Sequence, residues 1–484
     1  MQRLASRSLC ATVFAALAFA AAAPQTRPAV EVGSRRQLVL DDFWFETKNK
    51  IDLVLHPPVL REVVLRCDRP WERKILHYSS VIYDQGRYRM YYRADEGDPR
   101  VDARTDRTWV CYAESRDGIH WDKPSLGLAS HGGSTANNIL SDKKDLFNIS
   151  VIVDPNEKAG SDRRYKMISR VGGITGFVSG DGLHWRPVET NPLLRRDQGP
   201  FDSHNILLWD DEARKYVIYL RGIDKSVPGE FGGGRRAIRR SESTDFLHWS
   251  EPKLVVTADA SDPADFHFYT NAAVKYERAA RVFLMFPMIL HQGRTYPGAP
   301  NPGVSEVVFA SSRDGIHWDR LLRQAYIEPG LDERNWVDRN PIMGQGVVPT
   351  GPGELSLYYS ELFRSPESRM RRATVRTDGF VSARGPYTGW GEFRTRPLRF
   401  TGRRLELNFR TSGGGSLQVA LEDEGGRALD GFGFDDCPEI FGDKIEGIVR
   451  WKKGEDLTGL AGKPVRLRVR LRDAEVFAFR FASE

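Results

Sequence analysis

The chain has 484 residues, which is enough for two or three domains with large hydrophobic cores. Its 71 Lys and Arg residues against 65 Asp and Glu residues give a net charge of only +6, and the basic residues are scattered. A nucleic-acid-binding face is therefore not expected, because such a face requires a basic patch or stripe.

The first 23 residues have the pattern of a secretory signal peptide. Arg3 and Arg7 precede an apolar run at residues 9–22, and three small residues end at Ala23. The run is short for a membrane span, and no later stretch approaches the roughly 20 apolar residues that a span requires. We expect an exported, soluble protein, periplasmic or extracellular, without a membrane span.

Three cysteines remain after removal of this signal: Cys67, Cys111 and Cys437. They lie in different segments, which is neither a disulfide framework nor the spacing of metal ligands. We expect buried free thiols, and no spacing in the sequence calls for a metal or another cofactor.

Residues 24–56 contain a polar linker and two predicted strands, at residues 37–46 and 51–55. We expect one of these strands to pair with the last unit of the repeat domain that follows. Such pairing closes a ring and removes an exposed sheet edge.

A seven-residue motif recurs along the middle of the chain. The first copy reads Ser-Arg-Asp-Gly-Ile-His-Trp at residues 115–121, and the others occupy residues 179–185, 243–249 and 312–318. Their tryptophans are 64, 64 and 69 residues apart, and a weaker copy follows at residues 377–380. A fixed period of this kind indicates a repeat architecture.

Predicted strands precede each copy of the motif. In the first unit they cover residues 77–84, 87–94 and 108–115, with a turn at residues 84–86. With the short segment after the motif, each unit has about four strands, the content of one propeller blade. We therefore predict an all-β fold in which residues 57–390 form a five-bladed β-propeller.

The motif itself is interpreted as architectural. Asp-Gly supplies a tight turn in three of the copies, Ser hydrogen-bonds to the turn, and Trp fills the gap between units. Its histidines occupy the same place in different units and therefore cannot converge on one metal ion: His120, His184, His248 and His317.

A Gly- and Pro-rich stretch at residues 384–391 ends the repeat pattern. Residues 391–484 then show at least six short alternating segments, which predict a β-sandwich. This domain is either a carbohydrate-binding accessory module or a buttress that packs against the propeller.

Candidate site residues follow from the predicted propeller, because its inner strands converge on a central funnel. Cleavage of a glycosidic bond requires one carboxylic acid and a second carboxylate, and a third can raise the pKa of the acid. We assign these roles to Glu72, Asp202 and Asp265, with Glu306 and Glu361 in reserve. Further polar and aromatic side chains at the same end of the units are predicted to bind the substrate: Arg93, Asp95, Arg170, His204, Asn205, Arg221, Tyr269, Asn271, Trp336 and Glu361.

Two segments carry a resemblance to known families. Residues 201–217, which begin Phe-Asp-Ser-His-Asn, resemble the blade of invertase-like and arabinanase-like glycoside hydrolases in which Arg-Asp-Pro precedes a strand and an acidic hairpin. Residues 243–250 are similar to the Ser-x-Asp-hydrophobic-x-His-Trp segment of glycoside hydrolase family 32. The resemblance implies a five-bladed propeller with a C-terminal β-sandwich over nearly the whole mature chain. It also implies that Asp202 matches the transition-state-stabilising aspartate of that family.

The chain departs from family 32 at two motifs. The Trp-Met-Asn-Asp-Pro nucleophile motif and the Glu-Cys acid motif are absent. Glu72 and Asp265 are therefore assigned by their position in the repeat, and the substrate of the family is not carried over. The chain is more similar to a group of exported, family-32-like bacterial proteins.

These observations predict an exported, monomeric glycoside hydrolase that cleaves a poly- or oligosaccharide. The alternatives are a non-catalytic glycan-binding propeller and a sialidase, which Arg93, Arg170 and Arg221 at the ends of three second strands would suit. The sialidase motif, however, has one more residue between Asp and Gly. A phosphorolytic enzyme is a third alternative. Export of the protein away from cytoplasmic phosphate metabolism argues against it.

Overall fold

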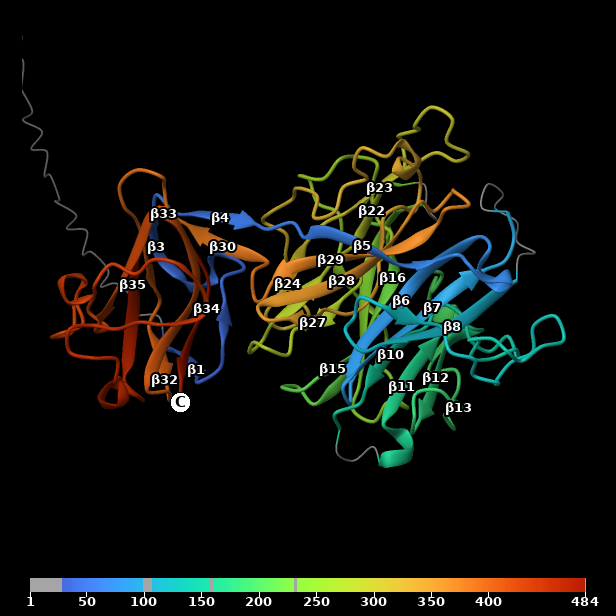
Figure 1. Ribbon diagram of the computed structural model, residues 1–484, viewed down its shortest axis with the longest axis horizontal. Helices are drawn as coiled ribbons and strands as arrows, with labels where there is room; N and C mark the ends of the chain where they lie inside the picture. Colours follow the sequence, from blue (N-terminus) through green and yellow to red (C-terminus); the bar gives the residue numbers. More distant parts are fainter. Residues whose placement is uncertain (1–27, 99–106, 157–159, 230–232, 484) are drawn as a thin grey trace, which may run out of the picture.

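The structure is a computed structural model that describes residues 28–98, 107–156, 160–229 and 233–483. It is all-β, with 48% strand and 5% helix. Figure 1 shows two lobes, a smaller one with the C-terminal strands and a larger one with the repeat units. The predicted signal peptide, residues 1–23, lies outside the described residues. Within those described residues no helix is long and apolar enough to cross a membrane.

Repeat units 1 to 3 each form an antiparallel sheet in which the first four strands are neighbours in chain order. Unit 1 consists of β6 (Ile75–Asp84), β7 (Arg87–Asp95), β8 (Thr108–Ser115) and β9 (Trp121–Asp122). Unit 2 consists of β10 (Ser150–Val153), β11 (Tyr165–Ser169), β12 (Gly173–Ser179), β13 (Arg186–Pro187) and β14 (Leu194–Arg195). Unit 3 consists of β15 (Ile206–Asp210), β16 (Lys215–Asp224), β17 (Arg235–Ser243) and β18 (Lys253–Val256).

Unit 4 is divided into two sheets. One sheet holds β19 (Phe266–Phe268), β22 (Met288–His291) and β23 (Val304–Val307), and the other holds β20 (Val274–Lys275), β21 (Phe283–Met285), β24 (Ala310–Ser312) and β25 (Trp318–Asp319). Pro287 lies between β21 and β22. Because proline has no backbone N–H, it interrupts the ladder at this point.

Unit 5 takes its outer strand from the N-terminal part of the chain. It contains β26 (Ile342–Met343), β27 (Val348–Gly351), β28 (Glu354–Glu361) and β29 (Arg369–Arg376). β5 (Val59–Arg66) pairs antiparallel with β29 and covers its edge. A strand at residues 37–46 or 51–55 was expected to pair with the last unit. Residues 52–55 pair with residues 381–384, which follow the weaker motif copy, but the N-terminal strand that covers β29 is β5.

The smaller lobe is one ten-stranded sheet. Its C-terminal strands are β30 (Val381–Arg384), β31 (Gly391–Thr395), β32 (Leu398–Phe400), β33 (Arg404–Glu422), β34 (Asp443–Ile448) and β35 (Pro464–Ala482). Four N-terminal strands complete it: β1 (Val30–Gly33), β2 (Gln37–Leu38), β3 (Phe45–Asn49) and β4 (Asp52–Leu55). They pair with β32, β35, β31 and β30 respectively. The lobe is therefore built from both ends of the chain.

Seven short 3-10 helices connect the described strands. They are η1 (Asp42–Trp44), η2 (Pro70–Glu72), η4 (Ser161–Arg163), η5 (Arg196–Gln198), η6 (Glu333–Asn335), η7 (Phe434–Asp436) and η8 (Thr458–Leu460).

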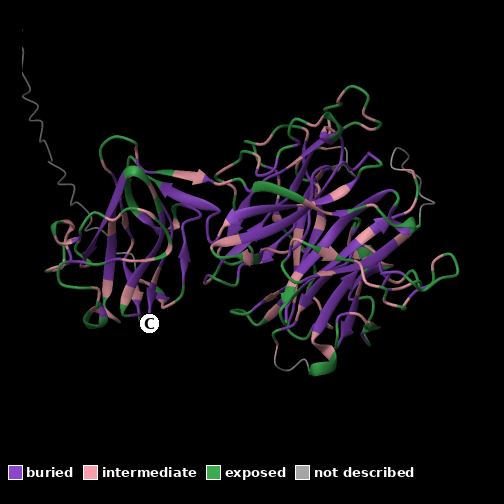
Figure 2. Cartoon of the chain, in the orientation of Figure 1, coloured by how far each residue is buried: buried purple, intermediate pink, exposed green. Residues whose placement is uncertain are grey.

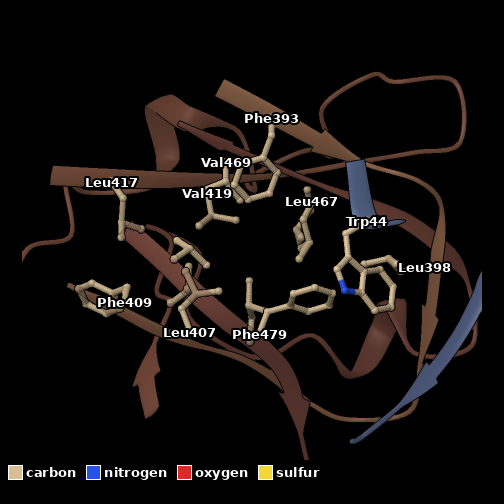
Figure 3. Packing of buried hydrophobic residues seen from close by; sticks show 14 of the residues in the cluster. Trp44, Phe393, Leu398, Leu407, Phe409, Leu417, Val419, Leu467, Val469 and Phe479 are labelled. Atoms are coloured by element: carbon tan, nitrogen blue, oxygen red, sulfur yellow. The ribbon is translucent and has the colours of Figure 1, made fainter. Parts of the chain in front are cut away.

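The hydrophobic core of the smaller lobe is enclosed by the strands of its sheet (Figure 3). Trp44 from the N-terminal segment packs edge-on against Phe479 of β35, with ring centroids 5.2 Å apart. Buried residues follow the strands in both lobes, whereas exposed residues concentrate in the loops (Figure 2). Cys111 and Cys437 are buried free thiols as predicted, and Cys67 is a half-buried one.

The repeated motif forms the same turn in each of its four full copies. In the first, Asp117 Oδ1 accepts from the backbone N–H groups of Ile119 and His120, both at 2.8 Å, and Gly118 has a φ of 74°. Three of the tryptophans contact a tyrosine of another unit: Trp121 contacts Tyr358 at 5.6 Å, Trp185 contacts Tyr91 at 6.2 Å and Trp318 contacts Tyr219 at 5.6 Å. The architectural interpretation of the motif is consistent with these contacts.

Gln345 lies where the first strands of several units meet. Its side-chain oxygen accepts hydrogen bonds from the hydroxyls of Ser80 in unit 1 (2.9 Å) and Ser150 in unit 2 (2.6 Å). Its side-chain amide donates to the carbonyl of Leu207 in unit 3 (2.8 Å). Residues far apart in the sequence therefore come together in the middle of the larger lobe.

Candidate functional site

Side chains from all five units gather next to the residues that contact Gln345, and we call this group the central cluster. Tyr78 precedes Ser80 by two residues, and Asn148 precedes Ser150 by two. The members of the cluster are His77, Tyr78, Arg93, Asp95, Asn148, Arg170, Asp202, His204, Arg221, Arg236, Tyr269, Arg339 and Phe363.

Asp202 is the exposed carboxylate of the central cluster, with 64% of its side chain accessible to solvent. One of its oxygens lies 3.1 Å from a guanidinium nitrogen of Arg170 in unit 2. The loop around Asp202 is held in place because Ser203 donates to the carbonyl of Tyr269 (2.8 Å) and Asn205 donates to the carbonyl of Phe201 (2.9 Å). A rigid loop therefore presents Asp202 to solvent.

Asp95 is the buried carboxylate of the cluster. Arg93 donates to both of its oxygens, at 2.8 and 2.7 Å, and also to the side-chain oxygen of Asn148 at 2.8 Å. The guanidinium group lies 4.3 Å from the centre of the Phe147 ring. Both oxygens of Asp95 are engaged in this bidentate pair, which holds Arg93 in one orientation.

Tyr78 is turned into the cluster by a β-bulge in β6. The pairing register with β7 shifts between His77 and Ser80, and Tyr78 has a φ of 51°. This conformation costs a bulky residue about 1–3 kcal/mol and persists only where the surroundings fix it. The ring stacks between His77, at 4.2 Å, and His204, at 5.2 Å. Burial raises the pKa of Tyr78, so its hydroxyl stays protonated at neutral pH.

The two histidines beside Tyr78 are neutral. Burial lowers the pKa of His204 to about 4, and burial together with the charge of Arg93 holds the pKa of His77 well below its usual value. His204 Nε2 lies 3.0 Å from the carbonyl of Ile149, which makes this nitrogen the donor. These rings therefore position Tyr78 and carry no charge at neutral pH.

Arg221 and Arg236 bring two further positive charges into the cluster. Arg221 donates to the backbone carbonyl of Asp202 at 3.2 Å, and Arg236 donates to that of Tyr269 at 2.9 Å. The guanidinium of Arg236 also lies 3.6 Å from the centre of the Tyr269 ring. Burial, and next the charge of Arg236, lower the pKa of Arg221 to about 10.

Glu72 lies apart from this group and is fully buried. Tyr92 donates to one of its oxygens at 2.6 Å, and Lys123 donates to the other at 2.5 Å. Burial raises the pKa of Glu72. The carboxylate thus holds η2 against β7 and has no exposure to a dissolved molecule.

Asp265 and Glu306 form a second acidic group in unit 4, and each of their side chains is 30% exposed. They contact opposite nitrogens of His291: Asp265 at 3.7 Å from Nδ1 and Glu306 at 3.2 Å from Nε2. The hydrogen bond with Glu306 raises the pKa of His291. His267 is close to both groups: its Nδ1 accepts from the backbone N–H of Arg236 at 3.2 Å, and the charge of Asp265 partly offsets the burial and the arginine charges that lower the pKa of His267 to about 4.

Asn205 and Asn271, predicted to bind substrate, are buried and bond to backbone groups. Trp336 donates to the carbonyl of Gly330 at 2.8 Å, and buried Glu361 pairs with Arg369 and Arg371. Glu361 lines a cavity of about 330 Å³ in unit 5 together with Tyr359, Asn335 and Asn340. Neither Trp336 nor Glu361 is a member of the central cluster.

Seven of the residues predicted from the sequence lie in the central cluster: Asp202, Arg93, Asp95, Arg170, His204, Arg221 and Tyr269. The sequence analysis did not identify every member. It missed His77 and Tyr78, because a bulge inside a regular strand pattern leaves no signal in a single sequence. It also missed Arg236, which lies on the third strand of unit 3 and reaches into the neighbouring unit.

Metal ligation is not indicated in the parts of the chain that the structure describes. There, no three or more His, Cys, Asp or Glu side chains are grouped so that they could hold a metal ion.

Comparison with known proteins gives structural neighbours only. No family model and no curated protein matches the chain. One similar solved structure is a glycoside hydrolase, 14% identical, covering 66% of this chain and 92% of that one, with a TM-score of 0.45. Another is a glycoside hydrolase family 43 arabinoxylan arabinofuranohydrolase from Bacillus subtilis, in complex with cellotetraose (12%, 85% and 96%, TM-score 0.43).

A third neighbour is an N-acetylgalactosamine deacetylase from F. plautii in complex with blood group B trisaccharide (13% identity, 67% of this chain and 95% of that one, TM-score 0.43). At these identities, and with TM-scores below 0.5, the likeness carries no conclusion about this chain by itself. It does not extend to a substrate, to catalytic residues or to glycoside hydrolase family 32.

Proposed function

We propose that this chain is an exported glycoside hydrolase that cleaves a poly- or oligosaccharide in the middle of a five-bladed, family-32-like propeller. The observation that carries the proposal is Asp202. Its exposed carboxylate stands beside Arg170, at a centre that also contains the rings of Tyr78 and Tyr269. Aromatic rings suit the faces of sugars, and carboxylates are the groups that cleave glycosidic bonds.

Asp202 and Asp265 remain in the proposed mechanism. Cleavage requires an acid that protonates the leaving oxygen and a second carboxylate on the opposite face, about 5–10 Å away. Asp202 acts on the reacting sugar, and either Asp265 or Glu306 supplies the second carboxylate. Glu72 is not given a catalytic role, because its carboxylate is fully buried.

The test is a glycan-library hydrolysis screen with the full chain and Asp202→Asn. We expect the variant to lose at least about 100-fold in rate, as the loss of a general acid or base usually causes. Asp197→Asn is a matched control. Asp197 lies five residues before Asp202, is also exposed, and has a carboxylate oxygen 3.2 Å from the guanidinium group of Arg195. Equal activity of Asp202→Asn and wild type would remove Asp202 from catalysis.

A non-catalytic glycan-binding function is the second candidate. The bidentate contact of Asp95 with Arg93 favours it, because this engages both oxygens of the other carboxylate in the central cluster. Binding of a glycan by calorimetry, with no product from any glycan in the screen, would establish this function in place of hydrolysis.

A further inference from the structure

We infer that His291, with Asp265 behind its ring, positions Glu306, so that Glu306 is the carboxylate of unit 4 that reaches the substrate. This inference rests on the proposed function, which leaves the choice between Asp265 and Glu306 open. It gives the three side chains different parts: Glu306 reacts, His291 holds it in place, and Asp265 orients His291.

The strand pairing of unit 4 brings the three side chains together. In β22, Ile289 is opposite Glu306 of β23, and His291 is two residues farther along. Alternate residues of a strand point to the same face, so the long side chain of Glu306 reaches the ring of His291 diagonally. On the other side of β22, His291 is opposite Phe266 of β19, and Asp265 directly precedes that residue. The ring therefore lies between carboxylates that come from opposite neighbours of β22.

The ring of His291 is held in one place. Its side chain is 14% exposed, and Phe266 packs edge-on against it with ring centroids 5.9 Å apart. Its Nε2 lies 3.2 Å from Glu306 Oε1, which is a hydrogen-bonding distance. Its Nδ1 is shielded from solvent and lies 3.7 Å from Asp265 Oδ1, as in an ion pair. A side chain fixed in this way can fix the carboxylate that it contacts.

The charges around the ring favour the same arrangement. The hydrogen bond with Glu306 raises the pKa of His291 against the effect of burial, and the charges of Glu306 and Asp265 raise it further. Arg294, on the loop after β22, opposes them. His267 on β19 adds no charge at neutral pH, because burial and nearby arginines lower its pKa to about 4. A protonated ring donates from both nitrogens and can hold one carboxylate at each.

The two carboxylates differ in what their second oxygens contact. Asp265 Oδ2 accepts from the backbone N–H of Gly293 at 3.2 Å, so both oxygens of Asp265 face groups of the protein. Glu306 contacts His291 through Oε1, and within the part of the chain that the structure describes its Oε2 has no hydrogen-bond or ion-pair partner. Both side chains are 30% exposed. Of the two, Glu306 therefore has the oxygen that is available to a substrate.

Steady-state kinetics on the glycan found in the screen tests these parts in the full chain. Glu306→Gln should lower kcat at least about 100-fold, as the loss of a reacting carboxylate does. His291→Phe and Asp265→Asn should each lower kcat about tenfold with KM nearly unchanged, because they misplace the reacting group without removing it. His291→Gln should retain most of the activity, since its amide can still donate to Glu306.

The matched control is His317→Phe, which should leave kcat unchanged. His317 is a histidine of the same unit that also pairs with a carboxylate, Asp314 at 2.6 Å, but it lies in a motif turn. Thermal unfolding verifies that each variant is folded.

A double variant separates positioning from direct action. Asp265→Asn combined with His291→Phe should have the kcat of His291→Phe alone, because Asp265 acts only through the ring. Effects that multiply would show that Asp265 itself reaches the substrate and would overturn the inference. A loss in Asp265→Asn as large as that in Glu306→Gln, or full kcat in His291→Phe, would overturn it as well.

An NMR titration of the ring nitrogens of His291 requires no substrate. Its signals are those among the 10 histidines of the chain that disappear in His291→Gln. We expect both nitrogens to be protonated at about pH 6, and Glu306→Gln to lower the pKa of the ring more than Asp265→Asn does. A pKa that Glu306→Gln leaves unchanged would overturn the inference. If no glycan is cleaved, hydrolysis is overturned, and this titration decides whether His291 holds Glu306.

Discussion

The turns of the repeated motif and the central cluster use the same kinds of side chain in opposite ways. In the turns, Asp117, Asp181, Asp245 and Asp314 make the same contacts in four units: two backbone amides and the ring of a histidine three residues later. In the central cluster units 1 to 3 share an arginine near the end of the second strand, but the other side chains differ from unit to unit. Unit 1 provides Tyr78, Arg93 and Asp95, unit 2 Arg170, and unit 3 Asp202.

The difference shows where function is to be sought in a repeat protein. A contact that recurs in every unit serves what the units have in common, which is their shape. A residue that occurs in only one unit, at the place where all units meet, is not needed for the shared shape of the units. Such a residue can therefore bind a ligand. Each prediction below tests this division, from the largest expected effect to the smallest.

The largest effect concerns the second carboxylate of the proposed reaction. Asp265→Asn or Glu306→Gln should lower kcat by at least about 100-fold, because one of them provides the acid or the nucleophile. Asp245→Asn, in a motif turn, should leave kcat unchanged and lower only the thermal stability. Steady-state kinetics on the glycan found in the screen measures both. Full kcat in both unit-4 variants would place the second carboxylate elsewhere.

The next effect concerns the contact that joins the units. Gln345→Met removes the amide and leaves the hydroxyls of Ser80 and Ser150 and the carbonyl of Leu207 without this partner. We expect a loss of about 2–4 kcal/mol in the free energy of unfolding, because buried unsatisfied groups are costly. Urea unfolding followed by tryptophan fluorescence measures it.

A rescue experiment accompanies this change. Adding Ser80→Ala and Ser150→Ala to Gln345→Met should restore part of the lost stability, because replacing both partners by apolar groups is much less costly. A triple variant less stable than Gln345→Met would show that the hydroxyls contribute through other contacts, such as the amide of Val151 for Ser80.

A smaller effect concerns the turn carboxylates and depends on pH. Burial alone would raise the pKa of Asp314, but hydrogen bonds from His317 and Ile316 outweigh it and lower the pKa to about 2. The stabilisation is therefore complete above the ordinary pKa near about 4 and is lost as pH falls toward about 2.

Asp314→Ala should consequently cost about 1–2 kcal/mol at pH 7, the value typical of a lost capping carboxylate. This cost should shrink steadily between about pH 4 and pH 2. Urea unfolding of the variant and wild type at pH 7, 4 and 3 compares them. A cost that is the same at every pH would mean that shape, rather than the charge of Asp314, holds the turn.

The smallest effect concerns a histidine of the same turns. The side chain of His120 is 86% exposed, and its hydrogen bond to Asp117 raises its pKa. Its stabilising contact is present below the ordinary pKa near about 6.5 and is lost as pH rises through the raised value. His120→Ala should therefore lower the melting temperature slightly at pH 5.5 and have no effect at pH 8.5. A larger effect at pH 8.5 than at pH 5.5 would contradict this.

Much of the fold could be predicted because the repeat is explicit in the sequence. The spacing of Trp121, Trp185, Trp249 and Trp318 located the units, and the alternating segments located most strands. The partner of the last unit was missed, because residues 37–46, 51–55 and 59–66 all have the pattern of an edge strand. Only the pairing in three dimensions distinguishes them.

The site was predictable where it follows from the strand order. Arg93 and Arg221 lie near the ends of second strands and Arg170 directly follows one, so their meeting place is a consequence of the repeat. Glu72 has the position in the repeat that was expected for a catalytic carboxylate, but its side chain is buried and bonds to Lys123. That orientation depends on the packing of η2, and nothing in the local sequence specifies it.

The pairing of β1 to β5 with strands near the C-terminus has a consequence for biosynthesis. During translation these N-terminal strands emerge first, but the strands that receive them, β29 to β32 and β35, are made more than 300 residues later. At about 5–20 residues per second, the early segment waits tens of seconds with its edges uncovered. We therefore expect the smaller lobe to assemble only after its last strand has left the ribosome.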